Sequence, residues 1–335
     1  MRDGVRMALP ILLAAVATAA VSPLASTATA AEDKPSWCTE EKKLDAKKLP
    51  KKIKKSDCDL TGRVVTFGDV IAVDVPPPGM EASAEALMLN GSDQTIAVAT
   101  SADASEYDLV TPDGVSTPDG VTGGPQPCND PFYRGAGYKI VNQLGWYYNH
   151  TGAVTNLTNV QIAAGIKKGA DNMVLTRNDC NDPRVARSSH SYLGGTPRGA
   201  ANINADGSVC SYLPADGINV VAWRTMPTTG LSARLAVACT LRNMEGAGPN
   251  VVEAEWALNR AFVWDETTLD GCSNAWVISS VMTHEWGHTV GLDHADEATH
   301  GLQTMSTKIN APCGNDEQTL AQGEVDAMII KYGAR

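Results

Sequence analysis

The chain has 335 residues, of which 43% are hydrophobic and 19% charged, and its 27 basic and 38 acidic residues give a net charge of −11. This composition is typical of a globular protein of about two domains. The acidic balance argues against a nucleic-acid-binding function. Beyond the first 30 residues, no stretch is long and apolar enough to predict a membrane span.

Residues 1–30 have the pattern of a secretory signal peptide. Arg2 and Arg6 form a charged start, an apolar run follows over 7–21, and Ala28-Thr29-Ala30 supplies small residues for cleavage. Cleavage after Ala30, or a residue or two away, is the prediction. The protein is therefore expected to be secreted and extracellular, and the alanine-rich leader resembles bacterial ones.

Residues 31–110 are predicted to form a small mixed unit that precedes the main domain. Its clearest signals are short strands over 64–67 and 70–75, ended by a run of prolines at 76–78. Lysines cluster between residues 32 and 60; they could touch an anionic cell wall or simply form a solvated arm, and we favour the arm. The unit is either the propeptide of a zymogen or an accessory domain, and its N-terminal position favours a propeptide.

Residues 111–127 are predicted to be a linker. The sequence Thr-Pro-Asp-Gly occurs at 111–114 and again at 117–120, and Gly123-Gly124-Pro125 follows. Proline and glycine at this density favour turns over regular structure. A protease could cut such a segment, which is a second reason to consider a propeptide before it.

Residues 128–335 are predicted to form the catalytic domain. A helix is expected over 158–174, capped by Thr158 or Asn159, because apolar residues recur there at helical spacing. Strands are expected around it, near residues 138–148, 184–191, 218–223, 235–240 and 251–263.

The next segment, residues 284–294, has the sequence HEWGHTVGLDH. Apolar residues at 277, 278, 281 and 282 precede it at helical spacing, which predicts a buried helix. On that helix His284 and His288 lie four residues apart and share one face, as two ligands of a tetrahedral metal must. Glu285 is next to them and could take a proton from water at the metal.

Gly291 is expected to end this helix and turn the chain, because glycine accepts the left-handed backbone conformation. His294 could then return to the metal as a third ligand. Three protein ligands leave a fourth position open, which is typical of a catalytic rather than a structural zinc. Three of the six histidines in the chain fall in this segment, which makes a chance match improbable.

The HExxHxxGxxH pattern resembles the zinc site of the metzincin peptidases. Met305, eleven residues beyond His294, resembles the methionine of their Met-turn. Within that clan, Gly287-His288 and Gly291-Leu292-Asp293-His294 look most like matrixins, here of a bacterial secreted kind. Ala295 and Thr307 differ from the residues at these positions in other branches. The resemblance covers residues 128–335.

The resemblance implies an α+β fold with a twisted mixed sheet, a zinc helix, a Met-turn and a C-terminal helix near 319–333. It implies one catalytic Zn²⁺ held by His284, His288 and His294. Calcium is also common in the clan, although no specific calcium motif occurs here. By its order in the chain, Arg234 and the residues after it, Leu235, Ala236, Val237 and Ala238, match the exposed edge strand that pairs with substrate. The alternative is an ordinary interior strand.

Eight cysteines follow the leader: Cys38, Cys58, Cys128, Cys180, Cys210, Cys239, Cys272 and Cys313. An even number in an exported chain predicts four disulfides, whose pairing the sequence does not determine. We expect the sequential pairing. A rival for Cys128 is a thiolate that blocks the zinc, as in matrixin propeptides, but the flanking residues of that motif are missing.

The sequence therefore predicts a secreted zinc metalloendopeptidase in which Glu285 is the general base for a zinc-activated water. Its expected partners are protein or peptide substrates, and a monomer is expected. Two alternatives remain open: a peptidase that processes cell-wall peptides, and a non-catalytic zinc protein that binds the wall.

Overall fold

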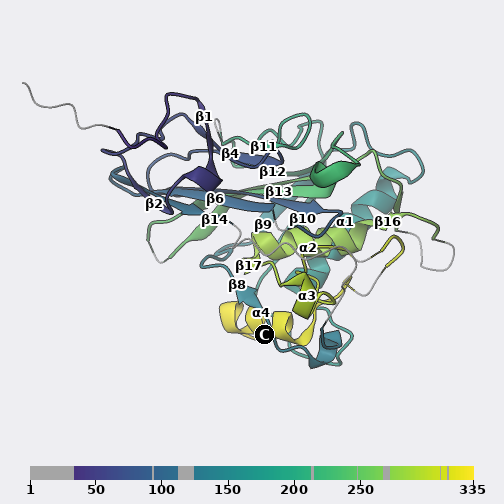
Figure 1. The fold of residues 1–335 in the computed structure, drawn as a ribbon. Coiled ribbons are helices and arrows are strands. Elements are labelled where there is room, and N and C mark those ends of the chain that lie inside the picture. The colour runs from purple at the N-terminus through teal and green to yellow at the C-terminus, as the bar shows by residue number, and fades with distance from the viewer. Residues whose placement is uncertain are drawn as a thin grey trace, which may run out of the picture. The chain divides into compact units, whose positions relative to one another are not determined.

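The computed structural model describes residues 34–92, 94–111, 124–212, 215–246, 248–266, 272–309, 311–314 and 317–335. The predicted signal peptide and residues 112–123 of the predicted linker lie outside these ranges. The described fold is mixed α and β, with few helices and a large mixed sheet (Figure 1). The α+β class predicted from the sequence is confirmed.

A nine-stranded sheet forms the centre of the fold, in the order β10-β9-β12-β14-β13-β5-β6-β7-β2. Neighbouring strands are parallel from β10 to β14 and antiparallel from β14 to β2. The strands of this sheet span Lys52–Lys54 (β2), Met80–Met88 (β5), Gln94–Thr100 (β6), Glu106–Val110 (β7), Leu144–Tyr148 (β9), His190–Gly195 (β10), Asn219–Arg224 (β12), Arg234–Asn243 (β13) and Asn250–Asn259 (β14).

Four helices and three smaller sheets complete the described structure. The helices are Asn159–Val174 (α1), Ile278–Thr289 (α2), Glu297–His300 (α3) and Gln322–Tyr332 (α4). A four-stranded sheet contains Lys43–Asp45 (β1), Val64–Phe67 (β3), Ile71–Asp74 (β4) and Val209–Cys210 (β11). Two strand pairs join Trp264–Asp265 (β15) to Trp276–Val277 (β16) and Arg134–Gly135 (β8) to Leu292–Asp293 (β17). Short 3₁₀ turns occur at Ala46–Lys48, Pro127–Asn129 and Gly230–Ser232.

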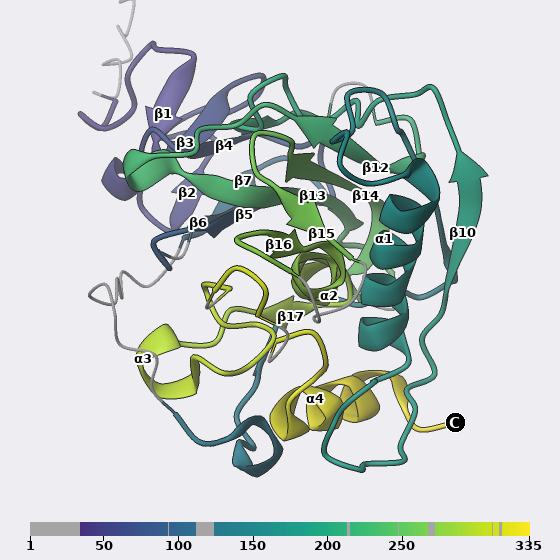
Figure 2. The same ribbon diagram turned by 90° about the vertical axis from the view of Figure 1, so that its right-hand side faces the viewer.

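The large sheet carries a hydrophobic core on each face. One face packs on α1 and α2, which lie side by side, and the other is covered by the small sheet of β1, β3, β4 and β11 (Figures 1 and 2). Successive side chains of a strand point to opposite faces. Ala236 and Ala238 therefore enter the core on the helix side, whereas Val237 and Cys239 enter the other core.

The helix α1 follows its sequence signals closely. Thr158 is its N-cap, and the Thr158 hydroxyl and the Gln161 side chain form a capping box. The apolar stripe of α1 packs against α2 at Gly169, where an added Cβ would lie only 2.6 Å from Cβ of Met282. This close approach buries one side of α2, and every residue of the helix is buried.

Residues 34–110 and 128–335 share the large sheet and the core beneath the small sheet. The strand β5 pairs with β13 along its length, and Ala84 and Ala86 of β5 pack with Val237 and Cys239 of β13. Residues Lys34–Arg335 form one compact unit. The sequence places residues 31–110 in a unit of their own; in the structure this segment extends the sheet of the predicted catalytic domain. Its removal as a propeptide stays a prediction.

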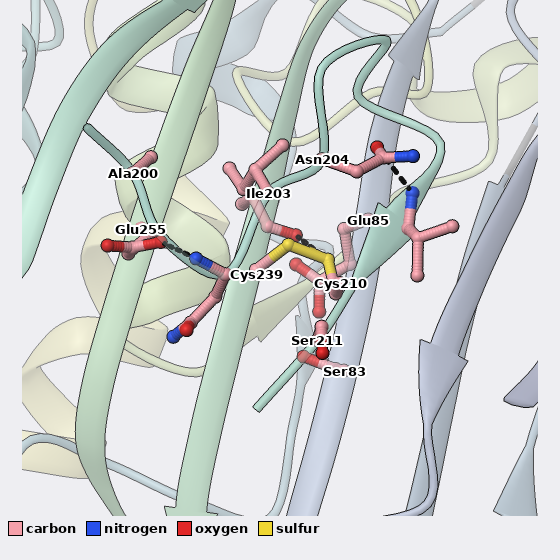
Figure 3. Close-up of a disulfide and its surroundings, with 12 residues drawn as sticks. Ser83, Glu85, Ala200, Ile203, Asn204, Cys210, Ser211, Cys239 and Glu255 are labelled. Atoms are coloured by element: carbon pink, nitrogen blue, oxygen red, sulfur yellow. Dashed lines mark hydrogen bonds between the residues drawn. A yellow bond between two sulfur atoms is a disulfide. The ribbon is translucent and has the colours of Figure 1, made fainter. Parts of the chain in front are cut away.

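The eight cysteines form four disulfides in the sequential pairing: Cys38–Cys58, Cys128–Cys180, Cys210–Cys239 and Cys272–Cys313. Because Cys128 is bonded to Cys180, it offers no thiolate to a metal. Cys210–Cys239 fastens β11 to β13 (Figure 3). Glu255 of β14 holds the loop before β11, because its carboxylate accepts from the backbone N–H of Asn202 at 2.6 Å. Four disulfides fit an oxidising, extracellular compartment. None of the helices in the described ranges has the length and apolarity that a membrane span requires.

Candidate metal centre

The first two predicted ligands lie on one face of α2. His284 and His288 are one helical turn apart, and both are buried. The Nδ1 atom of His284 donates to the carbonyl oxygen of Thr304 at 2.8 Å. A carbonyl oxygen can only accept, so the proton of the neutral His284 ring is on Nδ1 and its Nε2 carries a free lone pair.

Gly291 turns the chain at the end of α2. Its φ is +87°, and its N–H donates to the carbonyl oxygen of His288 at 3.0 Å. A Cβ at this position would overlap the carbonyl oxygen of Tyr138. Only glycine fits both the positive φ and the close approach. The chain then runs through β17 and brings His294 back to the helix.

The three histidines converge on one point. Each of the three distances between the Nε2 atoms of His284, His288 and His294 is 3.1 Å. Nitrogen ligands of a tetrahedral zinc, each 2.0–2.1 Å from the ion, stand about 3.3 Å apart. Burial lowers the pKa of His284 well below its usual value, and the neighbouring imidazoles add to this effect. Imidazole nitrogens that converge in this way fit a cation between them.

This trio is the only group of three or more potential metal-binding side chains that the described ranges bring together. It could hold a metal ion, as the sequence predicts. Three imidazole nitrogens are a donor set that suits a transition-metal ion.

Glu285, the predicted general base, is buried next to the ligands. Among the described residues, no group donates a hydrogen bond to either of its carboxylate oxygens. Burial raises the pKa of Glu285 well above its usual value, and the negative charge of Glu85 raises it further. A nearby cation opposes both effects, because positive charge favours the carboxylate. Such a carboxyl is suited to exchanging a proton with a bound molecule.

Met305 lies against the helix that carries the ligands. Its sulfur packs so closely on Gly287 that a Cβ at that position would overlap it. The carbonyl oxygen of Met305 accepts from the N–H of Ala295 at 2.7 Å. The N–H of Met305 donates to the carboxylate of Glu324 on α4 at 2.7 Å. The turn at Met305 is therefore tied both to the residue after His294 and to the C-terminal helix.

Two residues near the ligands come from the N-terminal part of the chain, and the sequence does not point to them. Oε2 of Glu85 on β5 lies 3.0 Å from Nδ1 of His288. The hydroxyl of Thr95 on β6 lies 3.3 Å from Nδ1 of His294. The one available signal is the alternation of alanine with polar residues over 82–86, which marks a strand with a polar face. It does not say what that face meets.

The predicted substrate strand has neighbours on both sides. In β13, Ala236 pairs with Leu258 of β14 on one side and with Leu87 of β5 on the other. Leu235, Ala236, Val237 and Ala238 thus lie in an interior strand, which is the alternative that the sequence leaves open. The strand β5 occupies this edge because its side chains alternate between the two faces of the sheet. Ala84 and Ala86 enter the core beneath the small sheet, and Leu87 enters the core on the helix side. A substrate role for these four residues stays a prediction.

The sequence matches no protein-family model, and no curated protein is found to be similar to it.

Proposed function

We propose that this protein is a secreted, zinc-dependent metalloendopeptidase with a metzincin-type catalytic domain of the matrixin kind. The observation that carries the proposal is the convergence of three Nε2 atoms, each 3.1 Å from the other two, next to a buried carboxyl that no described group engages. A metal and a proton acceptor side by side are what metal-assisted hydrolysis needs.

The ligand set supports zinc and a catalytic role. His284, His288 and His294 would hold the ion and leave room for water or substrate. Zinc bound there supplies a Lewis acid and lowers the pKa of a coordinated water to about 7. The Nδ1–H of His284 is fixed by the carbonyl oxygen of Thr304, which orients this ring for the metal.

Glu285 performs the proton transfers in the proposed reaction. Its carboxylate takes a proton as water attacks the scissile carbonyl carbon, and then passes that proton to the departing amine nitrogen. The apolar surroundings strengthen its basicity, because burial disfavours the charged form. No side chain is assigned to the substrate oxygen.

The arrangement of elements supports the metzincin-type interpretation. A helix carries two ligands, a glycine turn returns the third, and a methionine turn packs beneath the same helix at Gly287. A C-terminal helix, α4, then holds that turn through Glu324. The four disulfides and the predicted leader support export of the protein.

A second candidate is a peptidase of narrow specificity that processes cell-wall peptides. The pairing of β5 with β13 favours it, because an extended protein substrate cannot add to a strand edge that is already occupied. The third possibility, a non-catalytic zinc protein that binds the wall, is disfavoured by the buried and uncommitted carboxylate of Glu285. A solely structural metal site does not require an unpaired carboxylate next to its ligands.

One set of assays tests the proposal. The purified protein would be stripped with a chelator, reloaded with one equivalent of zinc, and incubated with casein, a peptide library and purified peptidoglycan. Cleavage of internal peptide bonds that depends on zinc supports the endopeptidase. Release of peptides from peptidoglycan alone would identify the narrow peptidase, and absence of cleavage from all three by the zinc-loaded protein would reject catalysis.

A further inference from the structure

We infer that Glu85 of β5 is a positioning residue for the metal ligand His288, so that the N-terminal strands are a working part of the metal centre. The inference rests on the proposed metal site but does not require that the site hydrolyse peptides. Of the two interpretations of residues 31–110, the inference favours an accessory segment that stays with the protein over a propeptide that is removed.

The backbone of β5 aims Glu85 at the metal centre. Side chains alternate along this strand, so Ala84 and Ala86 enter the core beneath the small sheet and Glu85 points to the opposite face, toward α2. There its Oε2 lies 3.0 Å from Nδ1 of His288, and both side chains are almost fully buried. A carboxylate this close to Nδ1 favours the tautomer with its proton on that nitrogen, which leaves Nε2 free for a metal.

A buried cation holds the other side of the Glu85 carboxylate. Arg242 of β13 lies 3.5 Å from Oε1 of Glu85 and also pairs with Glu81, four residues earlier on the same face of β5. Its guanidinium stacks on the ring of Tyr138, with 3.5 Å between Cζ and the ring centroid. A buried carboxylate needs such pairing to stay charged. The carboxylate of Glu85 is therefore held between Arg242 on one side and His288 on the other.

The same cluster fixes the backbone of the ligand. The hydroxyl of Tyr138 donates to the carbonyl oxygen of His288 at 2.6 Å. Glu85, Arg242 and Tyr138 thus hold both the ring and the main chain of one ligand. Thr95 of β6, the strand next to β5, approaches the ring of His294 as well. Two of the three ligands are in this way contacted by the N-terminal part of the chain.

Removal of residues 34–110 would undo more than one contact. Val237, Cys239 and Leu241 of β13 would lose the partners that bury them on one face of the sheet. Arg242 would lose both of its acidic partners while it remained stacked on Tyr138. No disulfide in the described ranges joins the two parts, so the N-terminal strands are held in place by noncovalent contacts.

Zinc affinity of the full-length protein, measured by competition with a chromophoric chelator, tests the inference without any peptidase assay. Glu81 provides the matched control, since it shares β5 and Arg242 with Glu85 but contacts no ligand. We expect Glu85→Ala to weaken zinc binding by about 10–100-fold. We expect Glu81→Ala to change the affinity by less than about threefold, because the ring of His288 keeps its partner. Equal losses in the two variants would overturn the inference.

If Glu85→Ala does not fold, Glu85→Gln and Glu81→Gln replace the alanine pair, with the absorption spectrum of the Co²⁺-loaded protein as readout. A changed ligand-field spectrum in Glu85→Gln alone supports the positioning role, and identical spectra in both variants reject it. Mass spectrometry of the zinc-loaded wild-type protein from culture medium completes the test. Residues 80–88 should be present, intact or as a bound fragment, and a metal-loaded form without them would contradict the inference. A wild-type protein that binds zinc but cleaves nothing would refute the proposed function alone.

Discussion

At the residue scale, the candidate metal centre depends on how its histidine rings are held. His284 is fixed by a carbonyl oxygen, and His288 faces a carboxylate, each at Nδ1. These contacts turn the Nε2 atoms inward. The HExxHxxGxxH pattern was enough to predict that His284, His288 and His294 come together, because helical spacing aligns the first two and the turn at Gly291 returns the third. Glu85 was not predictable, because it lies about 200 positions away in the sequence and meets His288 only through the pairing of two distant strands.

A histidine substitution tests the third ligand. His294→Ala should weaken zinc binding by at least about 100-fold, since two imidazoles alone form an incomplete site. His300→Ala is the control: His300 stacks on Phe132 and pairs with Asp130, away from the trio. Its zinc affinity should stay within about threefold of the wild type. The two affinities would be compared by chelator competition, and an unchanged value for His294→Ala would remove this residue from the ligand set.

At the element scale, α2 depends on close contacts that only glycine permits. Gly287→Ala would drive a methyl group into the sulfur of Met305, and we expect it to lower the free energy of unfolding by about 1–3 kcal/mol. Gly137→Ala, at an exposed position with open space around it, should change the free energy of unfolding by no more than about 0.5 kcal/mol. Urea denaturation of both variants is the measurement. An equal effect of the two substitutions would show that the contact between Gly287 and Met305 does not matter.

The helices were more predictable than the sheet. The apolar stripe and cap of α1 and the apolar run before His284 are local signals, and the structure has helices at both places. The neighbours of β13 were not predictable in the same way. Alternation shows that a segment is a strand, but not which strand pairs with it. The interpretation of Leu235 to Ala238 as an edge therefore depended on the resemblance alone, and β5 occupies that edge.

At the scale of the whole molecule, a buried acid links stability to pH. Burial raises the pKa of Glu255 to about 8 from its usual value near 4.5, even though the N–H groups of Ala201 and Asn202 favour its charged form. A raised pKa means that the folded state binds the proton more tightly than the unfolded state. The stabilisation is therefore complete below about pH 4.5 and is lost as the pH rises through about 8.

The variant Glu255→Gln isolates this effect, because its amide cannot titrate. Relative to this variant, the wild type should lose stability between about pH 5 and pH 8, with a slope of no more than about 1.4 kcal/mol per pH unit. Chemical denaturation across that range would measure it, and effects of the metal centre cancel in the comparison. Parallel stability curves for the two proteins would contradict the raised pKa.

The fold also explains why some of its features could be predicted from the sequence and others could not. Local patterns predicted the convergence of His284, His288 and His294, the mixed α and β class and the capped helix. They could not reveal that residues 34–110 complete the sheet, because that depends on which distant surfaces bury one another. The alternating alanines of β5 are explained by the small sheet that packs on them, and this packing is not visible in the local sequence.

The central claim is that Glu285 acts as the general base beside a zinc ion held by three histidines. The most direct test compares the hydrolysis of a peptide library by wild-type protein and by Glu285→Gln, each loaded with one equivalent of zinc. We expect both proteins to retain zinc, and kcat/KM for peptide cleavage to fall by at least about 100-fold in the variant. Turnover of Glu285→Gln close to that of the wild type would contradict the account.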